Sequence, residues 1–245
     1  MAGVHRKSIH CPPGVLISMG LLAGGALQSE AANAQTRTPA PPAVVTGDAA
    51  RRDVRVGAEV PNISGVWVAL TSNRSTPPYD GGATPFLPWA QAYFDHRGEA
   101  ERNGQPLFDP NANCLPGGVP RIISSPYPID ITQTPSLTMI STETLHEARM
   151  THMDGKPMPA DFKPSYFGYS VGHWEGDALV VETTGLSPYT QVDEEGRPKS
   201  KDMKVVERYQ KHAPNLLEVT YTLYDPRTYS RPWTVQARFR WARKN

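Results

Sequence analysis

Hydrophobic and polar residues alternate over long stretches between residues 129 and 241, which is the period of a β-strand with one buried face. The alternation is regular in residues 217–223 and again in residues 233–241. Gly176-Asp177, between two further stretches of strand character, is typical of a two-residue hairpin loop. We therefore predict an all-β fold in which an antiparallel meander closes into a β-barrel, because closure removes exposed strand edges.

One stretch has helical spacing instead. Residues 88–102 begin with a proline, which is favoured in the first turn of a helix, and Ala90, Phe94 and Arg97 recur at helical intervals. We predict one short helix there, which either covers a barrel mouth or packs outside the barrel. The rest of residues 71–128 is rich in Pro and Gly and is expected to form long loops, whose role the sequence does not indicate.

The first residues have the pattern of a secretory signal peptide. Basic Arg6 and Lys7 precede an apolar stretch at 14–23, and Ala32-Asn33-Ala34 fits the small-residue rule for cleavage. We predict a signal peptide at 1–34, a disordered Pro/Ala-rich linker at 35–61 and a single β-barrel domain at 62–245, in a periplasmic or secreted protein. A retained membrane anchor is the alternative, although the apolar stretch is shorter than the ~20 residues that a spanning helix needs.

Charge and cysteine content narrow the expected partners. The formal net charge is +1, so no long-range field attracts nucleic acid or anionic lipid. We expect a small hydrophobic or aromatic ligand as partner, no nucleic acid and no membrane span after signal cleavage, with an oligomer left open. Cleavage would leave Cys114 as the only cysteine, so the mature chain is expected to have no intrachain disulfide.

Glu207 is the first candidate for chemistry. It shares the inward face of an expected strand at 203–210 with Val205 and Tyr209. A carboxylate inside a barrel has to be paired, protonated or functional. Burial would raise its pKa toward the range in which a carboxyl moves protons at neutral pH. A salt bridge to a neighbouring arginine is the structural alternative.

Histidines in residues 145–152 are the second candidates. Ala148 and Met150 alternate with charged residues, which predicts that His146 and His152 face inward beside them. The two histidines lie about 20 Å apart at ~3.3 Å per residue, too far to ligate one metal ion. We therefore predict no metal site and no cofactor. A histidine bonded to haem iron and a core histidine bonded to a backbone carbonyl are the alternatives.

The hairpin at Gly176-Asp177 places further candidates. A two-residue loop pairs Trp174 with Leu179 and puts Trp174 on the apolar face. Tyr169, His173 and Glu182 then share the opposite face, and a shift of one residue in register would bring them inside.

Three motifs within this region resemble a group of exported bacterial proteins of unknown function with the motif WEGDxLVVxTTG. They are GHWEGDALVVETTG at 172–185, VVERY at 205–209 and YSRPWTV at 229–235. A Gly-x-Trp triplet at 65–67 also resembles the first strand of lipocalins. The wider likeness is to calycin-type barrels, which hold small apolar ligands and include haem binders and enzymes. The resemblance implies a calycin-like barrel and names no activity.

Our leading hypothesis is an exported, cofactor-independent enzyme of the lyase, dehydratase or isomerase type. It would use general acid and base groups on a small hydrophobic, aromatic compound in the barrel cavity. The alternatives are a non-catalytic periplasmic carrier or sensor of such a compound and a haem-binding barrel. A serine hydrolase is disfavoured, because the G-x-S-x-G pattern at 168–172 runs into a strand and not into a helix.

The candidate residues fall into two sets. The candidate catalytic residues are Glu207, His146, His173 and Tyr169. The candidate substrate-binding residues are Trp174, Tyr209, Tyr221, Trp233, His152 and Glu182.

Overall fold

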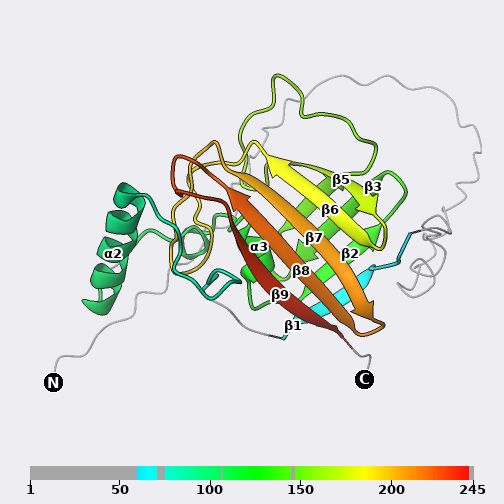
Figure 1. Cartoon of the computed structure of the whole chain (residues 1–245), viewed down its shortest axis with the longest axis horizontal. Helices are drawn as coiled ribbons and strands as arrows, with labels where there is room; N and C mark the ends of the chain where they lie inside the picture. The colour runs from blue at the N-terminus through cyan, green and yellow to red at the C-terminus, as the bar shows by residue number, and fades with distance from the viewer. Residues whose placement is uncertain (1–59, 71–74, 106, 145–146, 243–245) are drawn as a thin grey trace, which may run out of the picture. The chain divides into compact units, whose positions relative to one another are not determined.

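Nine strands form a closed barrel, which confirms the predicted all-β fold (Figure 1). The computed structural model describes residues 60–70, 75–105, 107–144 and 147–242. The predicted signal peptide, most of the predicted linker and the candidate His146 lie outside the described residues. The strands are β1 (Gly65–Ala69), β2 (Ile129–Gln133), β3 (Leu137–Thr142), β4 (Ala148–His152), β5 (Tyr169–Glu175), β6 (Ala178–Thr184), β7 (Lys204–Ala213), β8 (Leu216–Tyr224) and β9 (Trp233–Trp241).

Neighbours in the chain are neighbours in the barrel, and β1 closes the barrel against β9 through antiparallel pairs such as Trp67 with Trp241. One pair departs from the predicted antiparallel meander. β4 and β5 run parallel, and they pair only at Thr151 with Ser170 and at His152 with Val171. A parallel pair needs a long connection, which residues 153–168 provide. We call this short parallel contact the β4–β5 seam.

The hairpin between β5 and β6 has the predicted register. Trp174 pairs with Leu179 and His173 with Val180. Gly176 has a φ of 61°, a left-handed conformation that the first position of a type II′ turn requires and that glycine adopts without strain. This register puts His173 on the exposed face, as predicted.

Alternation correctly predicted the inner faces of β7, β8 and β9. Val205, Glu207 and Tyr209 of β7 are buried, and so are the alternate residues of β8 from Leu217 to Leu223. These side chains join others from β1, β2, β3 and β6 in one apolar core. Burial of this apolar area drives barrel formation, since each fully buried large side chain contributes roughly 1.5–3 kcal/mol.

The predicted faces of β4 are wrong. Met150 is 58% exposed and Ala148 is also exposed, whereas Arg149 and Thr151 are buried. His152 lies on the same outer face as Met150, and its ring stacks on Tyr169 at 4.6 Å. The physical reason is that Arg149 has a buried partner, described below: with Arg149 outside, that partner would be an unpaired buried charge, which costs more than exposing Ala148 and Met150.

The single-turn helix α3 (Arg121–Ser124) covers one end of the barrel, and the Lys211 side chain of β7 lies at the other. At the end where β8 stops and β9 starts, α3 inserts Ile122 and Ile123 into the core. At the opposite end, the Lys211 ammonium lies 5.9 Å from the Trp67 ring and 5.7 Å from the Trp241 ring. The interior is therefore packed along its length and is not an open calyx.

The predicted helix is present as α2 (Pro88–Arg102), in addition to α3 and the 3₁₀ turn η1 (Asn111–Asn113). α2 lies beyond one end of the barrel strands (Figure 1). The Phe94 ring of α2 packs against the Phe86 ring, tilted by 34° with centroids 5.2 Å apart, and lies 5.0 Å from the Arg197 guanidinium, so the helix packs on loops. No helix among the described residues is long and apolar enough to cross a membrane.

Cys114 follows η1 and is disulfide-bonded. The other cysteine of the sequence, Cys11, lies outside the described residues.

Candidate functional site

The inward carboxylate of Glu207 lies in a fully buried ion pair with Arg149. Arg149 Nη1 donates to Glu207 Oε1 at 2.7 Å, and Arg149 Nη2 donates to the other carboxylate oxygen. The remaining donors of Arg149 reach Ser170 Oγ at 3.0 Å and Thr183 Oγ1 at 2.6 Å. The Tyr209 hydroxyl also donates to Glu207, at 3.3 Å. The alternative weighed for Glu207, a salt bridge to an arginine, is what the structure contains.

Both carboxylate oxygens of Glu207 are bound within this interior network. Burial acts to lower the pKa of Arg149, but the Glu207 carboxylate and the Tyr209 hydroxyl outweigh it, so the pKa is raised and Arg149 stays charged. Its charge is neutralised only by Glu207. The network therefore acts as a structural clamp that holds four strands together.

Four other candidates lie on the outer surface. His173 Nε2 is 3.1 Å from Glu175, and both side chains are more than half exposed. Glu182 is likewise exposed and forms an ion pair with Lys204 at 3.1 Å. Tyr169 and His152 form the stacked pair described above, so the prediction that His152 faces inward is wrong. The structure does not bring any of these four to Glu207.

The inward aromatic candidates are mainly core residues. Trp174 is partly buried and packs against the core, and Trp233 is 2% exposed beside the Tyr229 ring at 5.3 Å. Tyr209 uses its hydroxyl on Glu207. Within the described part of the chain, the Tyr221 hydroxyl and Trp233 Nε1 are both buried without a hydrogen-bond partner, and of the two only Tyr221 lines a hollow.

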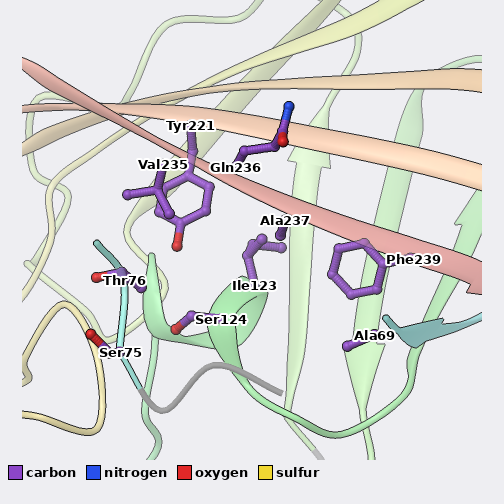
Figure 2. A pocket seen from close by; sticks show the side chains of 10 residues that line it. All are labelled: Ala69, Ser75, Thr76, Ile123, Ser124, Tyr221, Val235, Gln236, Ala237 and Phe239. Carbon is purple, nitrogen blue, oxygen red and sulfur yellow. The ribbon is translucent and has the colours of Figure 1, made fainter. Parts of the chain in front are cut away.

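This hollow, which we call the Tyr221 hollow, opens at the α3 end of the barrel (Figure 2). The hydroxyl of Tyr221 points toward Thr76 and Ser124, between Val235 of β9 and Ile123 of α3. All atom-free space in the hollow, out to the solvent, amounts to about 260 Å³. Its lining is Ala69, Ser75, Thr76, Ile123, Ser124, Tyr221, Val235, Gln236, Ala237 and Phe239.

Tyr221 is held neutral in this hollow. Burial raises the pKa of its hydroxyl well above the usual range, the carboxylates of Asp193 and Glu207 add to the effect, and Arg197 and the nearby Ser124 hydroxyl act against it. A neutral phenol without a partner is a ready donor to an acceptor oxygen of a ligand. An unmet donor at a buried position costs about 1–3 kcal/mol, so a partner there would be favourable.

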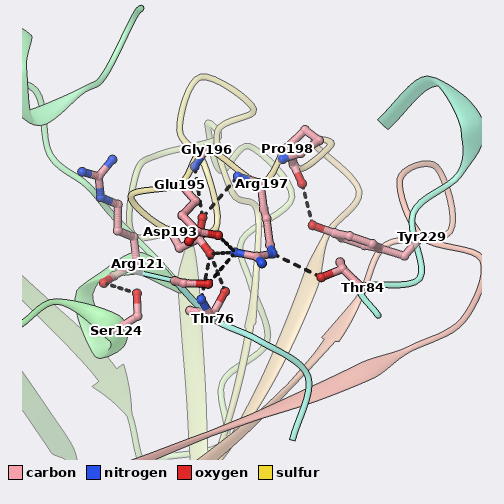
Figure 3. Close-up of polar contacts among 11 residues, drawn as sticks. Thr76, Thr84, Arg121, Ser124, Asp193, Glu195, Gly196, Arg197, Pro198 and Tyr229 are labelled. Carbon is pink, nitrogen blue, oxygen red and sulfur yellow. Dashed lines mark hydrogen bonds and ion pairs between the residues drawn. The ribbon is translucent and has the colours of Figure 1, made fainter. Parts of the chain in front are cut away.

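A second buried ion pair holds the wall of the Tyr221 hollow (Figure 3). Asp193 is fully buried and accepts hydrogen bonds from the Thr76 hydroxyl at 2.7 Å and the Thr76 amide at 2.9 Å. Arg197 donates to the same carboxylate and reaches Ser75 and Thr84, each at 3.2 Å. This cluster positions the Ser75 and Thr76 hydroxyls, which line the hollow opposite Tyr221.

The Asp193–Arg197 pair was not among the sequence candidates. It lies in the loop from 185 to 203, which has neither strand nor helix period to show a buried face. The available signal was the turn sequence Asp-Glu-Glu-Gly-Arg, in which the amides of Gly196 and Arg197 donate to Asp193 at 3.1 and 3.2 Å. Asp residues accept such local bonds in many turns, so the signal does not by itself distinguish a buried position.

Among the described residues, no group of three or more His, Cys, Asp or Glu side chains could hold a metal ion. Of the two histidines weighed as haem ligands, His146 lies outside the described residues, and His152 lies on the outer face of the barrel. No protein family model matches the chain, and no curated protein or solved structure is similar enough to count as a match. The resemblance to exported bacterial proteins therefore stays a prediction.

Proposed function

We propose that this protein binds a small, mostly apolar compound through one acceptor oxygen in the Tyr221 hollow. The supporting observation is the neutral, unpartnered hydroxyl of Tyr221 among the apolar side chains of Ile123, Val235 and Phe239. Ligand sites combine apolar walls with a few polar groups that orient the ligand, and this hollow has that composition. A carbonyl or ether oxygen would accept the hydrogen bond.

Binding is a better account of this site than turnover. The residues that line the Tyr221 hollow include no carboxylate and no histidine. The two nearest buried carboxylates, Asp193 and Glu207, are each committed to an arginine. This arrangement favours the carrier or sensor over the acid–base enzyme, which stays an untested prediction.

The size of the hollow limits the ligand. The enclosed volume of the hollow is about 10 Å³, room for roughly one water-sized group and far below the ~300–1,000 Å³ of pockets that enclose drug-sized ligands. The site therefore admits one acceptor group of a ligand, while the rest of the compound lies over the opening, toward solvent.

Acetophenone and ethylbenzene form a matched pair of probes, because they share the ring and differ in the carbonyl oxygen. Ligand-observed NMR titration of the full chain should give tighter binding of acetophenone. Tyr221→Phe should remove that preference, a loss of about 0.5–1.5 kcal/mol for one neutral hydrogen bond. Ethylbenzene binding should not change.

Tyr209→Phe is the control, since it deletes a buried tyrosine hydroxyl that does not line the hollow. It should keep the preference for acetophenone. Equal binding of both probes to the unaltered chain, or an unchanged preference in Tyr221→Phe, would contradict the proposal.

A further inference from the structure

A second hollow lies on the other side of α3, and we call it the Glu147 hollow. All atom-free space in it, out to the solvent, amounts to about 210 Å³. It shares no lining residue with the Tyr221 hollow. Its lining is Asn111, Gly117, Arg121, Ile122, Ser125, Thr142, Thr144 and Glu147.

Hydrogen-bond acceptors without partners gather in this hollow. The side-chain oxygens of Asn111, Thr142 and Thr144 are buried and make no hydrogen bond. Thr142 as a whole is only 7% exposed, so solvent does not satisfy its hydroxyl. Three unmet oxygens in one small hollow are unusual, because buried polar groups are nearly always paired.

Charge in the hollow is negative overall. Arg121 is neutralised by Asp109, whose two carboxylate oxygens accept its Nη1 and Nη2 at 2.8 and 3.3 Å. Glu147 is 6% exposed and has no such cationic partner; its carboxylate accepts the Gly117 amide at 2.7 Å. Burial raises the pKa of Glu147, against the effects of the Gly117 and Gly118 amides and of Arg121. A cation bound beside this carboxylate would favour its charged form.

We propose that the Glu147 hollow binds the protonated amino group of a small primary amine. A primary ammonium has three donors and no acceptor, which matches the unmet oxygens of Asn111, Thr142 and Thr144. Its positive charge matches Glu147, and a hydrogen bond between two charged groups is about twice as strong as a neutral one. An anionic ligand would be repelled by Glu147, and the donors of Arg121 are already paired with Asp109.

Four butyl compounds separate charge from hydrogen bonding: butylamine, butanol, butyltrimethylammonium and butyrate. NMR titration of the full chain at pH 7 should show butylamine binding at least tenfold more tightly than the other three. Butyltrimethylammonium has the charge without a donor, and butanol has a donor without the charge. Comparable binding of butylamine and either of these would overturn the proposal. A titration in which calcium binds and butylamine does not would also overturn it.

Two substitutions locate the site. Glu147→Gln should weaken butylamine binding tenfold or more, and Thr142→Val should weaken it about fivefold. Thr132→Val, an exposed threonine on β2, is the matched control and should bind as the unaltered chain does. Thermal unfolding of each variant shows whether the barrel is retained. If Thr142→Val is folded and binds butylamine normally, the Glu147 hollow is not the site.

Discussion

At the scale of single residues, charge pairing decides which side chains enter the barrel. Arg149 and Glu207 are fully buried and satisfy each other, and Asp193 and Arg197 repeat the arrangement in the loop beyond α3. A buried pair of this kind contributes little net stability, but removal of one partner leaves an uncompensated charge. The fold therefore depends on both members of each pair being present.

Arg149→Met should destabilise the protein by about 3–5 kcal/mol, because it leaves Glu207 buried without a partner. The double variant Arg149→Met/Glu207→Leu should lose less than either single variant, since no charge then remains inside. Urea unfolding followed by tryptophan fluorescence gives the three free energies of unfolding. Additive losses in the double variant would show that the two residues do not act as a pair.

Lys199 should make stability depend on pH. Burial lowers its pKa from the usual 10.5 to about 7, against the attraction of Asp225. Between those two values the unfolded chain binds a proton that the folded chain does not, so stability rises with pH by at most about 1.4 kcal/mol per unit. Lys199→Met should flatten this slope between pH 7 and 10 in urea unfolding. The exposed Lys163→Met should leave the slope as it is.

At the scale of elements, regular alternation allowed the prediction of β7, β8, β9 and the hairpin register, because their inner faces are filled by apolar side chains. It failed for β4, where Arg149 enters and Met150 leaves. The inward position of Glu207 could be predicted, but its partner could not, since the pairing joins strands far apart in the sequence. The loop from 185 to 203 has no period, so the Asp193 cluster was not predictable.

The position of α3 depends on a close backbone contact at Gly118. Its φ is 70°, and a Cβ there would lie 2.2 Å from the Tyr166 carbonyl oxygen. Gly155 has a φ of 71° and open space around it, so an alanine there measures the cost of the left-handed backbone conformation without a steric clash. Gly155→Ala should cost about 1–2 kcal/mol. Gly118→Ala should cost at least about 3 kcal/mol, because overpacking adds to the same backbone strain. Equal losses of stability in the two variants, measured by thermal unfolding, would show that the backbone around Gly118 and Tyr166 moves to accommodate the added Cβ.

At the scale of the whole molecule, the barrel has one weak join. The β4–β5 seam pairs at two positions, whereas β7 and β8 pair over most of their length. Arg149 of β4 contacts Ser170 of β5, Thr183 of β6 and Glu207 of β7, so side chains bridge the place where backbone pairing is shortest. The ion pair inside the barrel thus compensates for the seam.

Hydrogen exchange should reveal this unevenness. Amides of β4 should exchange faster than those of β8, because local opening follows the shortest ladder of backbone bonds. Glu207→Gln should speed exchange in β4 and β5 more than in β8 and β9, which mass spectrometry of peptides can measure. Uniform acceleration over all strands would mean that the ion pair stabilises the barrel as a whole.

Because β1 meets β9, the ring cannot be completed until β9 has been synthesised. A growing chain that ends anywhere before Trp233 leaves β1 and β8 each with one unpaired edge, open to a neighbouring copy. During assembly, intramolecular ring closure therefore competes with edge-to-edge association, and removing β9 would favour the second.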